Sequence, residues 1–317
     1  MEQAIFVQDL TKRYPSQRDR QALSGLSVEV YPGQLYGLIG PDGAGKTTAL
    51  RILSTVIRES SGTAKIGGFR VHDQAEKVRA CIGYMPQNFS LYPDLTVQEN
   101  LEFFADINGV HKEHKRTRID EMLEFIHLSD FRGRKAGYLS GGMKKKLALA
   151  CALAHDPKVL LLDEPSTGVD PVSRRELWLL LSSVVQNGVA VLVSTPYMDE
   201  AERCHEVGIL YDGHLLASGK PETLIGQLPF RVVEVKARPR KAIRQIVGSL
   251  EGVITWRPVG DRLRLAVANT TGAVERVIAS LEAQIREQSL EVRLLREAKG
   301  TMEDVFVHMI EQRQALP

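Results

Sequence analysis

The 317-residue sequence contains only 3 cysteines, and no apolar run approaches the roughly 20 residues needed to cross a bilayer. Because Cys81, Cys151 and Cys204 are too few and too scattered for a disulfide or zinc framework, we expect reduced thiols in the cytoplasm. The N-terminus meets an acidic residue at once and has no apolar segment followed by a cleavage site. The sequence therefore predicts neither a membrane span nor a secretory signal.

A large excess of charge of one sign is also missing. The chain has 41 Lys and Arg against 39 Asp and Glu, a formal net charge of +2. Domains that bind nucleic acid usually carry a strong basic excess, so this balance predicts no nucleic-acid partner. The basic run from His111 to Arg118 is interpreted as the exposed start of a helix.

Hydrophobic periodicity predicts a large α/β domain over residues 1–228. Short apolar runs bounded by turn residues indicate buried strands, and a helical subdomain is expected at about residues 88–155. The predicted strands cover 5–14, 24–33, 34–40, 158–165 and 189–195, with a hairpin at 206–219 and a helix at 47–55.

A second domain, predicted over residues 229–317, shows the order βαββαβ, which is the ferredoxin-like α+β motif. A final amphipathic helix follows it, with Thr301 and Asp304 as a capping pair. We interpret this domain as an accessory part with a regulatory or dimerisation role. Its strands are expected at 231–237, 253–259, 262–268 and 290–296, and its helices at 239–250, 272–288 and 301–314.

A glycine-rich phosphate-binding loop is the most specific motif of the sequence. GPDGAGKTT, residues 40–48, fits GxxxxGK[ST] between a predicted strand and a predicted helix. In such a loop backbone N–H groups converge on phosphate, Lys46 reaches the β- and γ-phosphates, and the Thr47 hydroxyl binds Mg²⁺. The motif therefore predicts ATP and Mg²⁺ as ligands.

Two adjacent acids end the apolar strand VLLLDE. Because Mg²⁺ takes oxygen ligands, Asp163 is predicted to join Thr47 at the ion. Glu164 is predicted to position the attacking water. An Asp-Glu pair alone is more often a loop start, but the glycine-rich loop reverses that preference.

The stretch LSGGM, residues 139–143, is where the chain resembles the nucleotide-binding subunits of ABC transporters, whose signature is LSGGQ. The resemblance covers residues 1 to about 226. It implies a P-loop NTPase fold of the ABC cassette type, with a RecA-like core plus antiparallel β and helical subdomains. It also implies head-to-tail pairing with a second nucleotide-binding domain, in which Ser140, Gly141 and Gly142 hold the partner's ATP.

Further residues match the family one by one. Tyr14 resembles the aromatic residue that stacks on adenine, although an ordinary half-buried strand tyrosine is the alternative. Gln87 resembles the glutamine that contacts Mg²⁺ and water, and Asp170 the aspartate that communicates across the dimer. The predicted catalytic residues are Glu164, Gln87 and Lys46, the metal ligands Thr47, Gln87 and Asp163, and the nucleotide-binding residues Tyr14, Gly40, Pro41, Asp42, Gly43, Ala44, Gly45, Lys46, Thr47, Thr48, Ser140, Gly141, Gly142 and Asp170.

Within the family the chain is most similar to ATPase subunits of type 2 exporters, on STPYMDEAERC, NFSLYPDLTVQENL and GTMEDVF. It also resembles the first cassette of two-cassette exporter ATPases. The resemblance implies multidrug or antibiotic efflux through separate membrane-spanning permease subunits. It places the chain at the cytoplasmic side of the cell membrane as a peripheral subunit, with coupling near Gln87, Phe89, Leu91 and Tyr92.

One departure from the family concerns catalysis. Pro196 occupies the position of the switch histidine, and proline offers neither a side-chain donor nor a backbone N–H. We therefore hypothesise that this chain's own site binds ATP but hydrolyses it slowly. His205 is an alternative donor, although an exposed histidine without a catalytic role is the preferred interpretation.

Two smaller departures flank the motifs. Asp42 replaces a common asparagine, and MKKKL follows the signature in place of a pattern containing glutamine. Those lysines are expected to face solvent or to compensate charge at an interface. Two alternative functions stay open: a cytoplasmic ABC ATPase without transport, and a degenerate nucleotide-sensing module.

Overall fold

The structure is a computed structural model that describes residues 2–15, 21–88 and 91–314. The chain divides into two compact units, Met1–Pro221 and Glu222–Pro317. The division falls after Pro221, the first residue of α8 (Pro221–Gly226). The rest of α8 belongs with the second unit, where Ile225 and Leu228 lie against Gly300.

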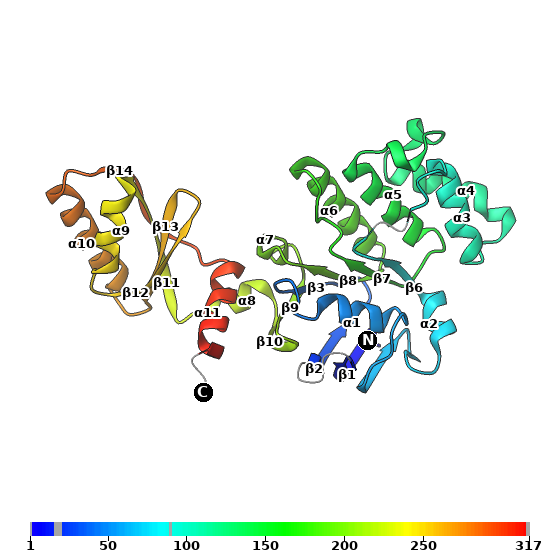
Figure 1. The fold of residues 1–317 in the computed structure, drawn as a ribbon, viewed down its shortest axis with the longest axis horizontal. Coiled ribbons are helices and arrows are strands. Elements are labelled where there is room, and N and C mark those ends of the chain that lie inside the picture. The colour runs from blue at the N-terminus through cyan, green and yellow to red at the C-terminus, as the bar shows by residue number, and fades with distance from the viewer. Residues whose placement is uncertain (1, 16–20, 89–90, 315–317) are drawn as a thin grey trace. The chain divides into compact units, whose positions relative to one another are not determined.

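A six-stranded sheet forms the centre of the first unit (Figure 1). Its inner strands β3, β8 and β7 are buried at every residue, as expected for parallel strands that are covered on both faces. All neighbours pair in parallel except the hairpin that adds the edge strand β10. The order is β10 (His214–Gly219), β9 (Glu206–Tyr211), β3 (Leu35–Ile39), β8 (Ala190–Thr195), β7 (Val159–Asp163), β6 (Ile82–Met85).

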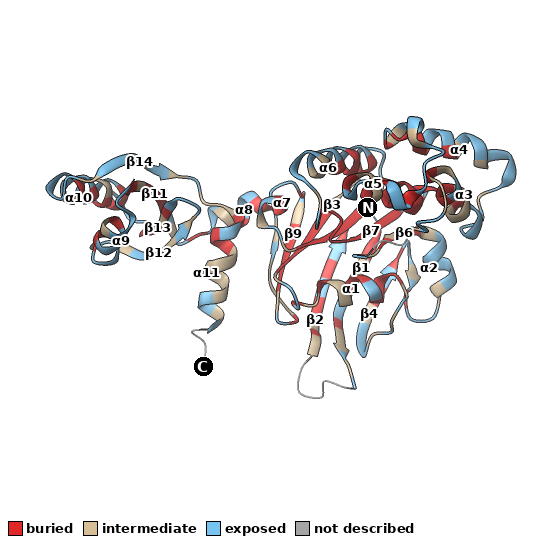
Figure 2. Cartoon of the chain, turned by 45° about the horizontal axis from the view of Figure 1, so that its top comes forward, coloured by how far each residue is buried: buried red, intermediate tan, exposed pale blue. Residues whose placement is uncertain are grey.

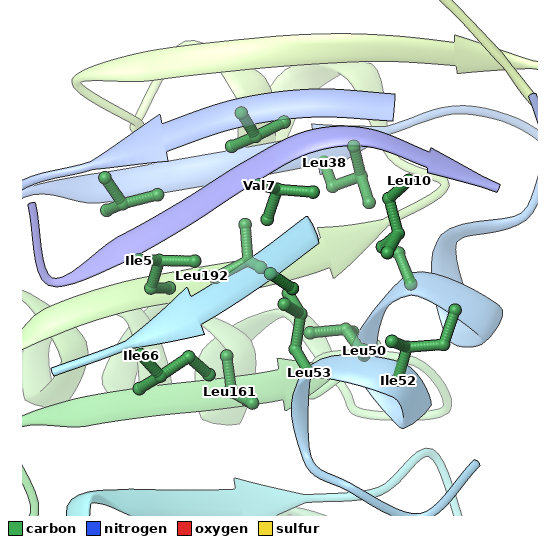
Figure 3. Close-up of a cluster of buried hydrophobic side chains, with 14 of the residues drawn as sticks. Ile5, Val7, Leu10, Leu38, Leu50, Ile52, Leu53, Ile66, Leu161 and Leu192 are labelled. Carbon is green, nitrogen blue, oxygen red and sulfur yellow. The ribbon is translucent and has the colours of Figure 1, made fainter. Parts of the chain in front are cut away.

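A second, antiparallel sheet lies across α1 (Lys46–Leu53) from the central one. Helix α1 contacts β7 and β8 of the central sheet and β2 and β4 of the antiparallel sheet. Its side chains Leu50 and Leu53 lie in one apolar cluster with residues of both sheets (Figure 3). The antiparallel order is β2 (Gln21–Val30), β1 (Ile5–Arg13), β4 (Ser61–Ile66), β5 (Phe69–Arg70).

Helices make up the rest of the first unit. The helical subdomain contains α3 (Val97–Ile107), which begins with a capping box between Thr96 and Glu99. Helices α3, α4 and α5 contact one another, and α5 also contacts α6 and β6. The remaining bounds are α2 (Ala75–Cys81), α4 (Lys112–Phe125), α5 (Gly141–Leu153), α6 (Pro171–Gln186), α7 (Met198–Ala201) and the 3-10 turns η1 (Ser129–Phe131) and η2 (Ala136–Tyr138).

The second unit has the predicted βαββαβ order, and its antiparallel strands lie in the order β12-β13-β11-β14. One face carries α9 and α10 over a buried apolar core, visible as the red inner faces in Figure 2. The other face binds α11 through Asp304, which accepts from Arg264 at 2.7 Å. The bounds are β11 (Phe230–Arg238), α9 (Arg240–Gly248), β12 (Val253–Val259), β13 (Arg262–Ala268), α10 (Ala273–Glu287), β14 (Glu291–Ala298) and α11 (Met302–Gln314).

The buried contacts of α1 predict that Leu50→Ala lowers the free energy of unfolding of the first unit by about 2 to 5 kcal/mol, because it leaves a cavity between two sheets. Urea unfolding followed by the fluorescence of Trp178, in a Trp256→Phe background, measures this loss. The matched control is Leu179→Ala, since Leu179 is 60% exposed and its truncation should change stability by less than about 0.5 kcal/mol. Equal effects of the two substitutions would contradict the packing argument.

Candidate functional site

The glycine-rich loop joins β3 to α1 and needs glycine at two points. A Cβ on Gly40 would lie 2.1 Å from the carbonyl oxygen of Leu210, and one on Gly45 would lie 2.4 Å from that of Ala22. Gly45 also has a φ of +109°, which side chains disfavour. The loop is therefore held against two neighbouring strands at the start of α1.

Lys46 spans this loop. Its side chain is 3% exposed, and its Nζ donates to the carbonyl oxygens of Gly40 at 2.8 Å and Pro41 at 2.9 Å. The same Nζ lies 3.5 Å from Oε1 of Glu164. The structure thus brings together the predicted phosphate-binding lysine and the predicted catalytic carboxylate.

Asp163, at the end of β7, collects two hydroxyl donors. Thr47 Oγ1 donates to its Oδ1 at 3.0 Å, and Ser194 Oγ donates to the same oxygen at 2.7 Å. The other oxygen, Oδ2, is buried and has no hydrogen-bond partner among the described residues. A buried carboxylate oxygen of this kind is a ready ligand for a cation.

Glu164 is fixed by contacts on both its main chain and its side chain. Its N–H donates to Ser194 Oγ at 3.0 Å, while its Oε2 accepts from Gln87 Nε2 at 3.0 Å and from Thr167 Oγ1 at 3.3 Å. Its φ is +49°, which is uncommon outside glycine and typical of functional positions. These contacts hold the carboxylate between Gln87 and Lys46.

A hollow of about 350 Å³ opens over these groups. Its size falls in the usual range for a small-molecule site. The Tyr14 ring lies at its edge, with Lys12 Nζ 5.2 Å from the ring centroid. The lining residues are Tyr14, Ala22, Asp42, Gly43, Ala44, Gly45, Lys46, Thr47, Thr48, Gln87 and Glu164. Most of the predicted nucleotide-binding residues therefore share one surface.

The signature residues Ser140, Gly141 and Gly142 lie at the start of α5 and not in this hollow. Ser140 is the N-cap of α5 and accepts from the N–H of Met143, and Gly142 approaches Ser173 so closely that a Cβ would lie 2.3 Å from its Oγ. Asp170 is the N-cap of α6, and backbone hydrogen bonds from Ser173 and Val172 lower its pKa. Within the described part of the chain, these residues do not line the hollow.

The segment after β8 contains Pro196, which is predicted to occupy the switch position. The carbonyl oxygen of Thr195 accepts from Gly40 N–H at 3.3 Å, so this strand end lies beside the glycine-rich loop. Pro196 follows directly. Thr195 Oγ1 then donates to buried Glu200 and accepts from the N–H of Tyr197 at 3.1 Å.

Arg174 on α6 contacts the segment that follows Pro196. Its guanidinium donates to Glu200 at 2.6 Å and to Asp199 at 2.9 Å, and it lies 4.6 Å from the ring centroid of Tyr197. Trp178 Nε1 also donates to Glu200 at 3.0 Å. Sequence reasoning missed this network, because it joins residues from two distant elements.

His205 lies at the wrong end of β3 to replace the switch histidine. Its Nδ1 accepts from the N–H of Leu35, the first residue of that strand, at 3.1 Å. The glycine-rich loop follows the last residue, Ile39. Four residue steps along a strand correspond to about 13 Å, so the alternative role of His205 is not supported.

The lysines after the signature are not at the surface as expected. Lys145 and Lys146 are 3% and 9% exposed. Lys146 pairs with Glu176 at 3.0 Å, while Lys145 points toward the carbonyl oxygens of Gln87 at 3.3 Å and Glu164 at 3.4 Å. The expectation that they face solvent was wrong for these two, because α5 packs them against α6 and the end of β7. The alternative role at an interface stays a prediction.

Two predictions remain without a structural test here. Phe89, expected in the coupling region, lies outside the described residues. Among the described residues no group of three or more His, Cys, Asp or Glu could hold a metal ion. The predicted metal ligands Thr47, Gln87 and Asp163 include only one acid, which suits an ion that keeps bonds to waters and phosphate.

Comparison with known proteins shows the family. A family profile described as "ABC transporter" matches residues 23–167. The Nod factor export ATP-binding protein I of Ralstonia nicotianae is 35% identical over 311 residues, which cover 96% of this chain and 93% of that protein. The chain belongs to the ATP-binding proteins of ABC transporters. The predicted family and the predicted fold class are thereby confirmed.

The chain is also similar to other ATP-binding cassettes of the same family. The probable multidrug ABC transporter ATP-binding protein YbhF of Escherichia coli (strain K12) is 47% identical over 220 residues. The match covers 69% of this chain but only 38% of YbhF. A dimeric ATP-binding cassette solved in a post-hydrolysis state with ADP and Pi has a TM-score of 0.63 and 28% identity, and the match covers 68% of this chain and 98% of that one.

Among the residues that the structure describes, none of the helices combines the length and the apolar character that a membrane span needs.

The close approach at Gly45 predicts that Gly45→Ala abolishes ATP binding, since the added Cβ meets the backbone and the φ is unfavourable. Titration with a fluorescent ATP analogue should show a Kd raised at least about 100-fold, as expected for a loop that no longer closes on phosphate. Gly133→Ala is the control, because nothing lies within 4 Å of its Cβ position. Parent-like binding by Gly45→Ala would refute the steric argument.

Proposed function

We propose that this chain hydrolyses Mg²⁺-ATP and that hydrolysis drives export through separate membrane-spanning permease subunits. One observation carries the proposal: Lys46, Thr47, Gln87 and Glu164 meet in one hollow of about 350 Å³ formed by the glycine-rich loop. The name of the relative Nod factor export ATP-binding protein I supports export as the direction of transport, and that of YbhF supports a role in a multidrug transporter.

The residues at the end of β7 fit a magnesium ion. Thr47, Gln87 and Asp163 would hold it, since the buried Oδ2 of Asp163 has no partner among the described residues and the Thr47 hydroxyl lies next to the same carboxylate. When bound, the ion neutralises charge on the phosphate oxygens. Lys46 adds a second positive charge and orients the phosphates with its ammonium donors.

Glu164 is assigned the role of positioning the attacking water and accepting its proton. Gln87 and Thr167 both donate to its Oε2, so the carboxylate has a fixed orientation. The amide of Gln87 lines the same hollow and helps to place the water. Fixing the reactants in this way removes an entropic part of the reaction barrier.

A second cassette is expected to complete the assembly. Ser140, Gly141 and Gly142 at the N-terminus of α5 form an anion site that would hold a partner's γ-phosphate, with Asp170 beside it. The chain would act as a peripheral subunit at the cytoplasmic side of the cell membrane. Residues 229–317 are proposed to serve as an accessory domain in regulation or dimerisation.

Pro196 is proposed to slow this chain's own site. Loss of one preorganised donor at a transition state typically lowers the rate about 100- to 1000-fold. The segment around Pro196 is held by Thr195, Tyr197 and Glu200 through contacts that do not depend on residue 196. A histidine at that position would therefore enter an existing scaffold.

Pro196→His is predicted to raise ATP turnover by about 100- to 1000-fold, because it supplies the missing donor. Steady-state phosphate release by the purified chain measures the change, with ATP-driven dimerisation recorded on the same samples. Glu164→Gln should abolish turnover while ATP binding persists. Brisk turnover by the parent that the histidine does not increase would refute the assignment of Pro196 as the brake.

In a mixed dimer with a cassette that carries the switch histidine, we predict unequal effects of two substitutions. Lys46→Ala disables only the slow site and should leave most activity, whereas Ser140→Ala removes a phosphate contact from the partner's fast site and should remove most of it. ATP turnover of the reconstituted pair measures both. Equal losses would contradict the asymmetric arrangement.

Pro196 also favours a second candidate, a nucleotide-sensing module that regulates a partner without hydrolysis. This function requires ATP binding and dimerisation without turnover by the parent chain. A cytoplasmic ABC ATPase without transport would instead copurify with ribosomes or DNA rather than with membranes. The turnover and copurification measurements separate the three functions.

A further inference from the structure

Lys145 is a buried basic residue in the first helical turns after the signature. Its side chain is 3% exposed, on α5, five residues after the N-cap Ser140. A buried ammonium is costly unless polar groups surround it. The polar groups around the Lys145 ammonium therefore indicate the role of its charge.

Two carbonyl oxygens from different segments face this ammonium. Lys145 Nζ lies 3.3 Å from the main-chain oxygen of Gln87 and 3.4 Å from that of Glu164. These distances are long for hydrogen bonds between neutral groups, but a full charge still interacts with carbonyl dipoles at this range. Lys145 thus connects the segment of Gln87 to the end of β7.

The side chains of the same two residues contact each other. Gln87 Nε2 donates to Glu164 Oε2 at 3.0 Å. Lys46 approaches the carboxylate of Glu164 from the hollow, while Lys145 approaches its carbonyl oxygen and is not among the lining residues of the hollow within the described part of the chain. The Gln87–Glu164 pair is therefore held from the nucleotide side by one ammonium and from α5 by the other.

We propose that Lys145 is a positioning residue of the ATPase site, which fixes the main chains of Gln87 and Glu164 relative to each other and to α5. The proposal rests on the proposed function, because it assigns Lys145 an effect that acts through Glu164. Lys145 does not touch the reacting atoms. It sets the angle at which the glutamate and the glutamine face the water.

The position of the ammonium is in turn fixed by the packing of α5. Gly142 lies so close to Ser173 of α6 that no side chain fits there. Since the N-cap Ser140 lies about 7 to 8 Å along the axis from Lys145, a displacement of the signature end reaches the two carbonyl groups through one rigid helix. The arrangement couples the signature to the catalytic pair within one chain.

The electrostatic surroundings agree with this role. Burial lowers the pKa of Lys145, and the negative charges of Glu164 and Asp163 act against that shift. The carboxylates thus help to keep the ammonium protonated. An apolar side chain would fill the space without the energetic cost of a buried charge, so packing alone does not account for the lysine.

The test compares Lys145→Met with Lys145→Arg and the matched control Lys146→Met in the full chain. Methionine has nearly the same length and no donor. We expect Lys145→Met to lower kcat about 10- to 100-fold with a KM for ATP within about twofold of the parent, because misplacing a reacting group lowers the rate without weakening phosphate binding. Lys145→Arg, which restores the charge, should recover part of kcat, and Lys146→Met should keep kcat within about twofold.

Glu164→Gln, measured in parallel, separates the two proposals. If it retains parent turnover, the proposed function of the glutamate fails, and the role of Lys145 fails with it. If it is inactive while Lys145→Met keeps the parent kcat, only the present inference fails. A joint loss of kcat, ATP affinity and thermal midpoint in Lys145→Met, or an arginine variant no better than methionine, would reduce Lys145 to a structural residue and overturn the inference.

Discussion

The packing of α1 between two sheets is the constraint on which the nucleotide site depends. The helix presents apolar side chains to both sheets, so its position and the direction of its N-terminus are fixed by burial (Figure 3). The glycine-rich loop is consequently pressed against the backbone of Leu210 and Ala22. Its phosphate-binding N–H groups are preorganised by a hydrophobic core rather than by the loop itself.

The carboxyl ends of three parallel strands supply the remaining groups. Asp163 and Ser194 come from β7 and β8, and the loop that follows β3 brings Thr47 to the same carboxylate. Ser194 links the acids, because it donates to Asp163 and accepts from the N–H of Glu164. The proposed metal ligand and the proposed base are therefore positioned by one hydroxyl. The lysine on α5 extends this arrangement to the helical subdomain.

Much of the fold and of the site follows from local patterns. Apolar runs predicted the buried strands β3, β7 and β8 but not β6, and the motif GPDGAGKTT placed Lys46 and Thr47 at the junction of strand and helix, where they begin α1. Ser194 and Glu200 escaped notice because a serine within a strand and an acid in a short helix have no distinctive spacing. Lys145 and Lys146 were assigned to solvent or an interface because lysines are rarely buried. Their contacts arise from how α5 packs, which no local pattern contains.

The sequence by itself determined the family, the order of elements in the second unit and the glycine-rich loop, because these depend on residue types at short, fixed spacings. It also predicts that Pro196 occupies the switch position. Only the tertiary structure decided that His205 lies at the far end of β3 and that Lys145 faces the carbonyl oxygens of Gln87 and Glu164. The physical reason is that burial, strand register and helix packing bring together residues whose separation along the chain carries no information about their contact.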